Sequence, residues 1–147
     1  MQSVILAAGK GSRLHPITVN RTKAMLPILG VPMVARVMET LVENGLDDFI
    51  LVVSPDDQEI VDYFETESKL DVRAQFVVQP ERRGMADALS RAAELIQDDF
   101  LLTACDNLVS GNDLGQMLAI WKSKPQPNGI LALMGEALST SGTPFRR

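Results

Sequence analysis

The stretch SVILAAGKGSR, residues 3–13, indicates the fold of this 147-residue chain because a short apolar run leads directly into a glycine loop. Residues 3–8 (SVILAA) are small or apolar and include β-branched side chains, which is typical of a strand buried on both faces of a parallel sheet. Gly9 and Gly11 allow backbone conformations that other residues resist, and they let amide N–H groups approach an anion closely. We therefore expect a buried strand that ends in a phosphate-binding loop.

The charges of the chain are unevenly distributed. The first 38 residues contain no Asp or Glu, whereas they hold Lys10, Arg13, Arg21, Lys23 and Arg36. All 19 acidic residues lie further along the chain, whose net charge is -5. Arg13 offers a forked guanidinium that matches phosphate geometry, and Lys23 offers a flexible point charge. Positive potential beside a glycine loop favours phosphate binding.

Two common phosphate motifs do not fit this loop. A Walker A loop needs Ser or Thr directly after its Gly-Lys pair. Here Gly11 follows Lys10. A dinucleotide fingerprint GxGxxG would need Gly where Leu14 stands. The loop therefore predicts neither a P-loop ATPase nor a dinucleotide-binding protein.

The rest of the sequence alternates between short apolar runs and amphipathic stretches. This alternation predicts an α/β fold with a mostly parallel, Rossmann-like sheet in three αβα layers. The expected strands after the first are residues 49–53, 72–78, 100–105 and 129–134. The expected helices start at Pro32 and end at Gly45, run from Ser54 to about residue 64, and cover residues 85–96 and 114–121.

Ligands of such sheets bind beyond the carboxyl ends of the strands. Gly9, Gln79 and Asp106 each follow an expected strand, so we expect them to converge on one edge of the sheet. The carboxylate of Asp106, followed by Asn107, is a hard oxygen ligand that suits Mg²⁺. The amide of Gln79 donates and accepts at once, which fits the imide edge of uracil or thymine, and Gly84 removes a side chain where a base would stack.

The longer string LAAGKGSRLHPITVNRTKAMLPILGVPM, residues 6–33, closely resembles the signature of the sugar nucleotidyltransferases. Two later segments are similar to this family in the same order. Residues 77–89 (VVQPERRGMADAL) resemble its base-reading loop, and residues 101–107 (LLTACDN) resemble its metal-binding strand end, with Cys105 where the family usually has Gly. The positions in register with the signature are Gly9, Gly11, Arg13, Leu14, Pro16, Thr18, Lys23, Leu26, Pro27, Pro32 and Met33.

The resemblance implies transfer of a nucleotidyl group from a nucleoside triphosphate to a sugar 1-phosphate, giving a nucleotide sugar and pyrophosphate. An ionised sugar phosphate attacks the α-phosphorus without a strong base, so the protein mainly aligns the reactants and neutralises charge. Arg13 and Lys23 are the implied catalytic residues, and Asp106 is the implied ligand of Mg²⁺. The implied nucleotide-binding residues are Leu6, Ala8, Gly9, Gly11, Ser12, Arg13, Gln79 and Gly84.

Members of this family are usually longer than this chain. The resemblance therefore implies that residues 1–147 are the nucleotide-binding half of a truncated nucleotidyltransferase domain, with the sugar-binding half largely absent. Two alternatives stay open at this point. One is a nucleotide-binding or regulatory fragment that lacks turnover. The other is a nucleotidyltransferase of the same fold with a non-sugar acceptor, such as a cytidylyltransferase or a molybdopterin guanylyltransferase.

Composition and charge narrow the partners and the location. The net negative charge argues against a nucleic-acid partner. A single cysteine makes no internal disulfide, and the N-terminal apolar run is shorter than a membrane span or a secretory signal. We expect a cytoplasmic protein that binds a nucleoside triphosphate and a sugar 1-phosphate but no membrane, and the sequence leaves a homo-oligomer open.

Overall fold

The computed structural model describes residues 1–123 of the chain, and the expected strand at residues 129–134 lies outside this range. A first compact unit spans Met1–Gly111, and a second begins at Asn112. Helix α4, Gly111–Ser123, confirms and extends the helix expected at residues 114–121. Within residues 1–123, no helix has the length and apolar character needed to cross a membrane.

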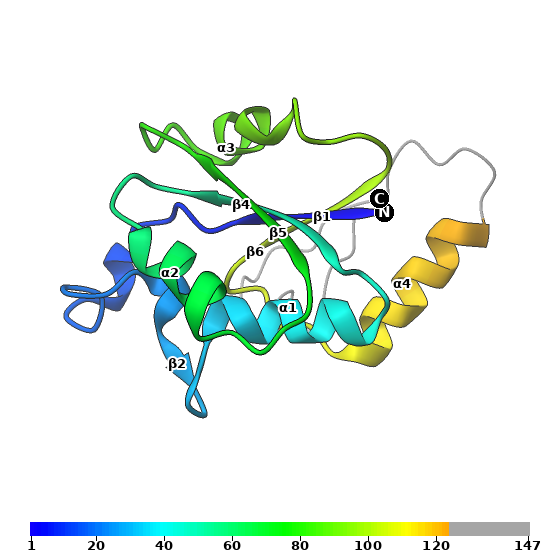
Figure 1. Ribbon diagram of the computed structural model, residues 1–147, viewed down its shortest axis with the longest axis horizontal. Helices are drawn as coiled ribbons and strands as arrows, with labels where there is room; N and C mark the ends of the chain where they lie inside the picture. The colour runs from blue at the N-terminus through cyan, green and yellow to red at the C-terminus, as the bar shows by residue number, and fades with distance from the viewer. Residues whose placement is uncertain (124–147) are drawn as a thin grey trace, which may run out of the picture. The chain divides into compact units, whose positions relative to one another are not determined.

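The first unit is built on a parallel sheet of four strands in the order β5-β4-β1-β6 (Figure 1). Strand β1 lies between β4 and β6, so that Val4 is in register with Ile50 on one side and with Leu102 on the other. This confirms the parallel sheet expected from the apolar runs. The strands are β1 (Gln2–Leu6), β4 (Asp48–Val53), β5 (Arg73–Val78) and β6 (Phe100–Ala104).

Helices cover both faces of this sheet, as expected. Helix α3 (Met85–Ala92) packs against β1, β4 and β5, and α1 (Met33–Glu43) and α2 (Gln58–Thr66) lie on the opposite face (Figure 1). Gly45 ends α1 with a φ of 80°, and its amide and that of Leu46 bond back to the last turn of the helix. The glycine therefore stops α1 where the sequence predicted.

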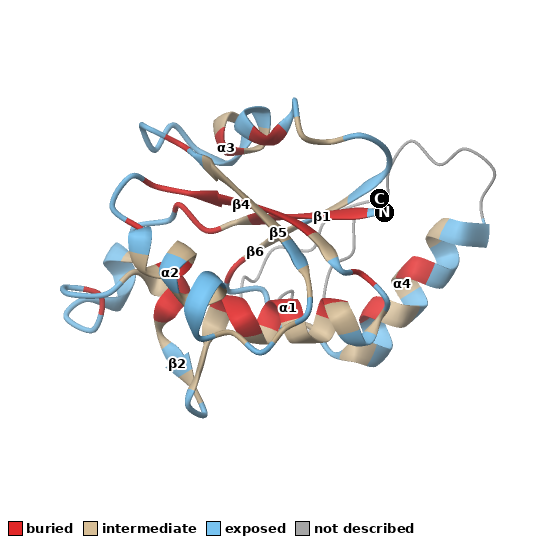
Figure 2. Ribbon diagram, in the orientation of Figure 1, coloured by how far each residue is buried: buried red, intermediate tan, exposed pale blue. Residues whose placement is uncertain are grey.

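The core occupies both faces of the sheet (Figure 2). Side chains alternate between the faces along a strand, and one set, including Val4, Ile50 and Val52, packs with Ala88 and Ala92 of α3. The alternate residues, including Ile5, Phe49 and Leu51, point toward α1 and α2 and are also fully buried. Burial on both faces explains why these strands have continuous apolar sequences.

Three helix boundaries differ from the sequence predictions. Helix α2 starts at Gln58 rather than Ser54, because the amide and hydroxyl of Ser54 both donate to the Asp57 carboxylate and hold residues 54–57 in a turn. Helix α3 ends at Ala92 rather than Ile96. The buried side-chain amide of Gln2 donates to the carbonyl oxygen of Leu95 and accepts the amide of Gln97, and these two bonds hold residues 95–97 outside the helix. Pro32 is the N-cap residue that precedes α1, whereas the sequence predicted it as the first residue of the helix.

A short hairpin ahead of α1 was not predicted. Strands β2 (Pro27–Ile28) and β3 (Val31–Pro32) pair in antiparallel register around Leu29 and Gly30. Both turn residues have positive φ, which a tight two-residue hairpin requires. Arg36 of α1 bonds the carbonyl oxygens of Ile28 and Leu29, so the hairpin is held against the helix.

The strand order reverses beside β1. From β1 the chain proceeds outward through β4 to β5 and then returns to place β6 on the other side of β1. In open α/β sheets the ligand crevice lies at such a reversal, beyond the carboxyl ends of the strands. The expected edge for a ligand therefore lies between the segments that follow β1 and β6.

Ser3 provides a test of this packing. Its hydroxyl is fully buried in β1 and makes no hydrogen bond to residues 1–123. Replacing it in Ser3→Ala should raise the free energy of unfolding by about 1 kcal/mol, because a buried hydroxyl without a partner is unfavourable. The matched variant Ser54→Ala removes a buried hydroxyl that donates to Asp57 and accepts from Arg82. It should lower the free energy of unfolding by about 1 kcal/mol. Urea unfolding measures the change in stability of both variants. If Ser3→Ala lost as much stability as Ser54→Ala, this packing would be contradicted.

Candidate functional site

The loop after β1 folds back on itself around Gly11. This glycine has a φ of 63° and a ψ of 26°, a left-handed conformation that opens the short 3-10 turn η1 (Ser12–Leu14). The Thr18 hydroxyl donates to the carbonyl oxygen of Gly11 at 3.0 Å and closes the loop. A Cβ on Gly11 would lie 2.9 Å from Cβ of Lys23. The glycine thus lets Lys23 pack directly against the loop.

Lys23 connects the segment after β1 with the segment after β6. It opens the 3-10 turn η2 (Lys23–Met25), in which Ala24 and Met25 are buried and fix its position. Its ammonium group pairs with Oδ2 of Asp106, which follows β6. This contact confirms the convergence of the two loops expected from the strand pattern. It places one cation and one carboxylate at the crevice between β1 and β6.

Two of the five basic residues of the N-terminal segment are free to meet an anion. Arg21 pairs with Glu59 at 2.9 Å and Arg36 pairs with Glu39 at 2.9 Å. Lys10 and Arg13 flank Gly11, are exposed, and have no hydrogen-bond or ion-pair partner within residues 1–123. Two uncompensated cations beside a folded loop form an anion-binding surface.

The end of β6 presents one carboxylate to solvent. The side chain of Asp106 keeps an exposed fraction of 39% despite its pairing with Lys23. The neighbouring Cys105 is buried, and this burial raises the pKa of its thiol to about 12, so the thiol is neutral and unreactive near pH 7. Among residues 1–123, no group of three His, Cys, Asp or Glu side chains is placed to hold a metal ion. A cation bound here would need ligand oxygens from elsewhere in addition to Asp106.

Arg82 joins three loops at this edge of the sheet, a role that the sequence did not reveal. Its Nε donates to the carbonyl oxygen of Ala8 at 2.9 Å, and Nη2 donates to the hydroxyl of Ser54 at 2.9 Å. These contacts link the segments that follow β5, β1 and β4. Arg82 therefore supports the backbone at the start of the glycine loop, and the only signal in the sequence was the unusual charge of residues 81–83.

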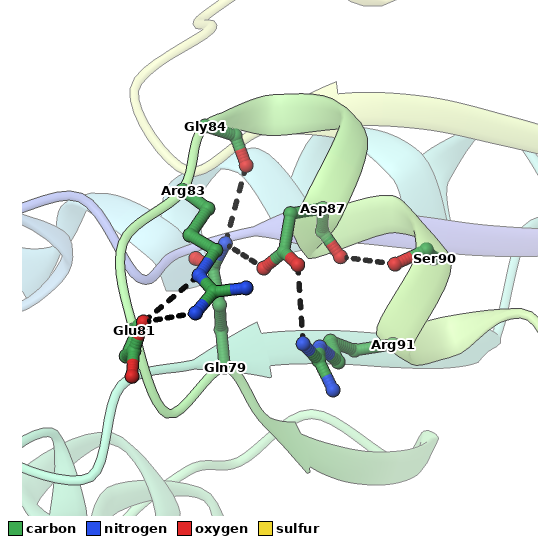
Figure 3. A network of polar contacts seen from close by, with 7 residues as sticks. All are labelled: Gln79, Glu81, Arg83, Gly84, Asp87, Ser90 and Arg91. Carbon is green, nitrogen blue, oxygen red and sulfur yellow. Dashed lines mark hydrogen bonds and ion pairs between the residues drawn. The ribbon is translucent and has the colours of Figure 1, made fainter.

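Gln79 and Gly84 lie together at the start of α3, as expected, but Asp87 joins them. The amide nitrogen of Gln79 donates to Gly84 O at 3.2 Å and to Oδ2 of Asp87 at 2.7 Å (Figure 3). Both amide hydrogens are therefore engaged, so in this arrangement the side chain can accept a hydrogen bond but has no free donor. Gly84 has a φ of 100° and a ψ of -179°, which in practice only glycine adopts. Its Cβ position is otherwise open.

The remaining predicted residues line the start of the loop. Leu6 ends β1, and its carbonyl oxygen accepts the amide of Cys105 at 3.1 Å. Ala8 is buried and held by Arg82, whereas Gly9 and Ser12 are exposed. The structure thus brings Gly11, Lys23 and Asp106 together in one cluster and Gln79 and Gly84 in another, and Arg82 links the second cluster to Ala8.

Comparison with known proteins gives the site a context. The sequence profile described as Nucleotidyl transferase matches residues 2–140. The chain is 40% identical over 140 residues to the "Bifunctional protein GlmU" of Methanococcus vannielii, an alignment that covers 90% of this chain and 32% of that protein. This match confirms the resemblance expected from the loop signature.

Solved structures agree with the fold. A UDP-glucose pyrophosphorylase from Acinetobacter baumannii superposes with a TM-score of 0.74 at 28% identity, over 83% of this chain and 52% of that one. Another UDP-glucose pyrophosphorylase, solved with UDP-glucose, gives a TM-score of 0.70 at 25% identity over 82% of this chain and 52% of that one. The chain therefore spans about half or less of the length of these relatives.

The two loop glycines offer a matched test of the loop geometry. Gly11→Ala should lower the free energy of unfolding by about 1–2 kcal/mol, because the left-handed backbone is strained for alanine. The new Cβ would also meet Lys23 Cβ at 2.9 Å and Thr18 Cγ2 at 3.1 Å. Gly9→Ala should leave stability nearly unchanged, since Gly9 has no positive φ and its Cβ position is open. Equal losses in urea unfolding would contradict the loop as described.

Proposed function

Because this chain belongs to the nucleotidyl transferase family, we propose that it binds a nucleoside triphosphate in the crevice between β1 and β6 and transfers the nucleotidyl group to a sugar 1-phosphate. The single observation that carries this proposal is the Lys23–Asp106 pair, which joins the loop after β1 to the end of β6 beside Gly11. A cation and a carboxylate held there suit a ligand made of phosphates and a divalent metal ion.

The reaction forms a bond between a phosphate oxygen of the sugar 1-phosphate and the α-phosphorus of the triphosphate. The bond from that phosphorus to the β-phosphate oxygen breaks, and pyrophosphate leaves with the electron pair. Since the attacking phosphate is already ionised, the protein needs no general base. Arg13 would contact the leaving pyrophosphate, the amides of Gly11 and Ser12 would bind the same oxygens, and Lys23 would neutralise charge on the phosphates.

The residues at the end of β6 fit Mg²⁺ in a limited way. Mg²⁺ in phosphate-transfer sites is commonly held by one or two carboxylates, with phosphate oxygens and water completing its six ligands. Asp106 supplies one exposed carboxylate, and within residues 1–123 it is not part of any group of three His, Cys, Asp or Glu side chains that could hold a metal ion. We therefore propose Asp106 as the protein ligand of Mg²⁺, which when bound offsets negative charge on the phosphates.

The activity is tested by pyrophosphate release. The chain is incubated with Mg²⁺, each nucleoside triphosphate and a panel of sugar 1-phosphates. Pyrophosphate that appears only with one triphosphate and sugar phosphate together is expected, and Arg13→Ala should slow it about 100-fold. Arg21→Ala is the matched control, because Arg21 lies in the same basic segment but is paired with Glu59. Triphosphate binding without release in any combination would instead identify a binding module, and release with a non-sugar acceptor would identify another transferase.

The metal role of Asp106 is tested by titration calorimetry. In the wild type, Mg²⁺ should raise the affinity for the triphosphate, because Asp106 would hold the ion and its charge would offset that of the phosphates. Asp106→Asn keeps the size of the side chain but removes its charge, so this Mg²⁺-dependent gain should disappear. Asp56→Asn is the control, because Asp56 is an exposed carboxylate in the segment after β4 that we assign no metal role. If Asp106→Asn retains the full gain, Asp106 is not the ligand.

A further inference from the structure

The amide of Gln79 is held in one orientation by its neighbours. The residue has an exposed fraction of only 3%, and its side-chain nitrogen lies between Gly84 O at 3.2 Å and Asp87 Oδ2 at 2.7 Å (Figure 3). Both of these oxygens can only accept hydrogen bonds, so the nitrogen must face them. The carbonyl oxygen of the same amide accepts no hydrogen bond from any residue between 1 and 123.

Asp87 is the charged member of this group. The hydrogen bond from Gln79, opposed by partial burial and aided by Arg91, holds the pKa of the Asp87 carboxyl below its ordinary value. Asp87 is therefore ionised near neutral pH and has no proton to donate. Arg91, one helical turn further along α3, bonds the other carboxylate oxygen at 3.1 Å. The carboxylate is thus fixed from both sides.

We propose that Asp87 is a positioning residue that turns the Gln79 carbonyl oxygen toward the nucleotide base and thereby sets base selectivity. This inference rests on the proposed function, together with the expectation from the sequence that Gln79 contacts the base. A fixed acceptor pairs with a base whose ring nitrogen carries a hydrogen, which describes uracil, thymine and guanine. Cytosine and adenine present a lone pair at the equivalent ring nitrogen, and two acceptors facing each other are unfavourable.

The main-chain geometry around Gly84 supports this arrangement. Gly84 caps α3, and its extended positive-φ conformation directs its carbonyl oxygen to the Gln79 nitrogen while the same oxygen accepts the amide of Ala88. The two acceptors that hold Gln79 therefore come from a glycine cap and from the first turn of the same helix. The N-terminus of α3 therefore holds the nitrogen of the Gln79 amide and leaves its carbonyl oxygen free.

The proposal is tested with nucleotide pairs that differ at this ring nitrogen. Calorimetry gives the dissociation constants of UTP against CTP and of GTP against ATP. The wild type should favour UTP or GTP within each pair that it binds. Asp87→Asn can present either an acceptor or a donor to Gln79, so the amide is free to turn and the preference should fall by roughly tenfold.

The matched control uses another Gln-Asp pair within residues 1–123. Gln58 of α2 donates to Asp62 at 2.9 Å on an exposed surface, so Asp62→Asn breaks an equivalent contact away from Gln79. It should leave both preferences unchanged. A loss of affinity for all nucleotides in Asp87→Asn, with the preferences kept, would show that Asp87 only stabilises α3 and would overturn the inference.

Other outcomes separate this inference from the proposed function. A wild type that binds triphosphates but favours CTP or ATP overturns the inference alone, whereas a wild type that binds no triphosphate overturns the proposed function as well. If Asp87→Asn does not fold, the wild type supplies the test by NMR. The two side-chain amide hydrogens of Gln79 should then exchange slowly with solvent, and rapid exchange of both would contradict a fixed orientation.

Discussion

The position of β1 between β4 and β6 is the constraint on which the rest of this structure depends. A central strand must be apolar on both faces, and Val4 and Ile5 satisfy this requirement on opposite sides of the sheet. The chain adds β4 and β5 on one side of β1 and then places β6 on the other side. The segments after β1 and β6 are therefore neighbours. Core packing and the location of the crevice therefore have one cause.

The glycine loop gains its shape from contacts that few residue types allow. Gly11 adopts a left-handed conformation with Lys23 directly against it, and Thr18 closes the loop through its hydroxyl. Arg82 holds the carbonyl oxygen of Ala8 from a distant segment. These restraints fix the backbone before any ligand arrives, so that binding an anion would cost little further ordering. The exposed side chains of Lys10 and Arg13 remain available for that anion.

The sequence predicted the four strands of the parallel sheet well because β1 and β4 are buried and apolar, and because β5 and β6 each contain a short apolar run. It predicted helix ends less well where a distant polar group decides them, as the Gln2 amide does for residues 95–97. The hairpin at residues 27–32 was missed because Leu29, at a φ of 50°, is an unusual residue for such a turn. Arg82 and Asp87 were missed for a related reason, since their partners are known only once the chain has folded.

Charge is distributed unevenly along the carboxyl edge of the sheet, so that one end of the proposed site is neutral and the other is positive. In the segment after β5, Arg83 pairs with Glu81, Arg82 is bonded to Ser54 and Ala8, and Gln79 offers a neutral carbonyl oxygen. The segment after β1 instead leaves Lys10 and Arg13 unpaired within residues 1–123. Since β5 and β1 are separated by one strand, these two regions lie roughly 10 Å apart across the sheet. A nucleoside triphosphate has the same polarity, with a neutral base at one end and phosphates at the other. The proposed ligand therefore has one orientation in which its charges are matched, with the base at Gln79 and the phosphates at Gly11.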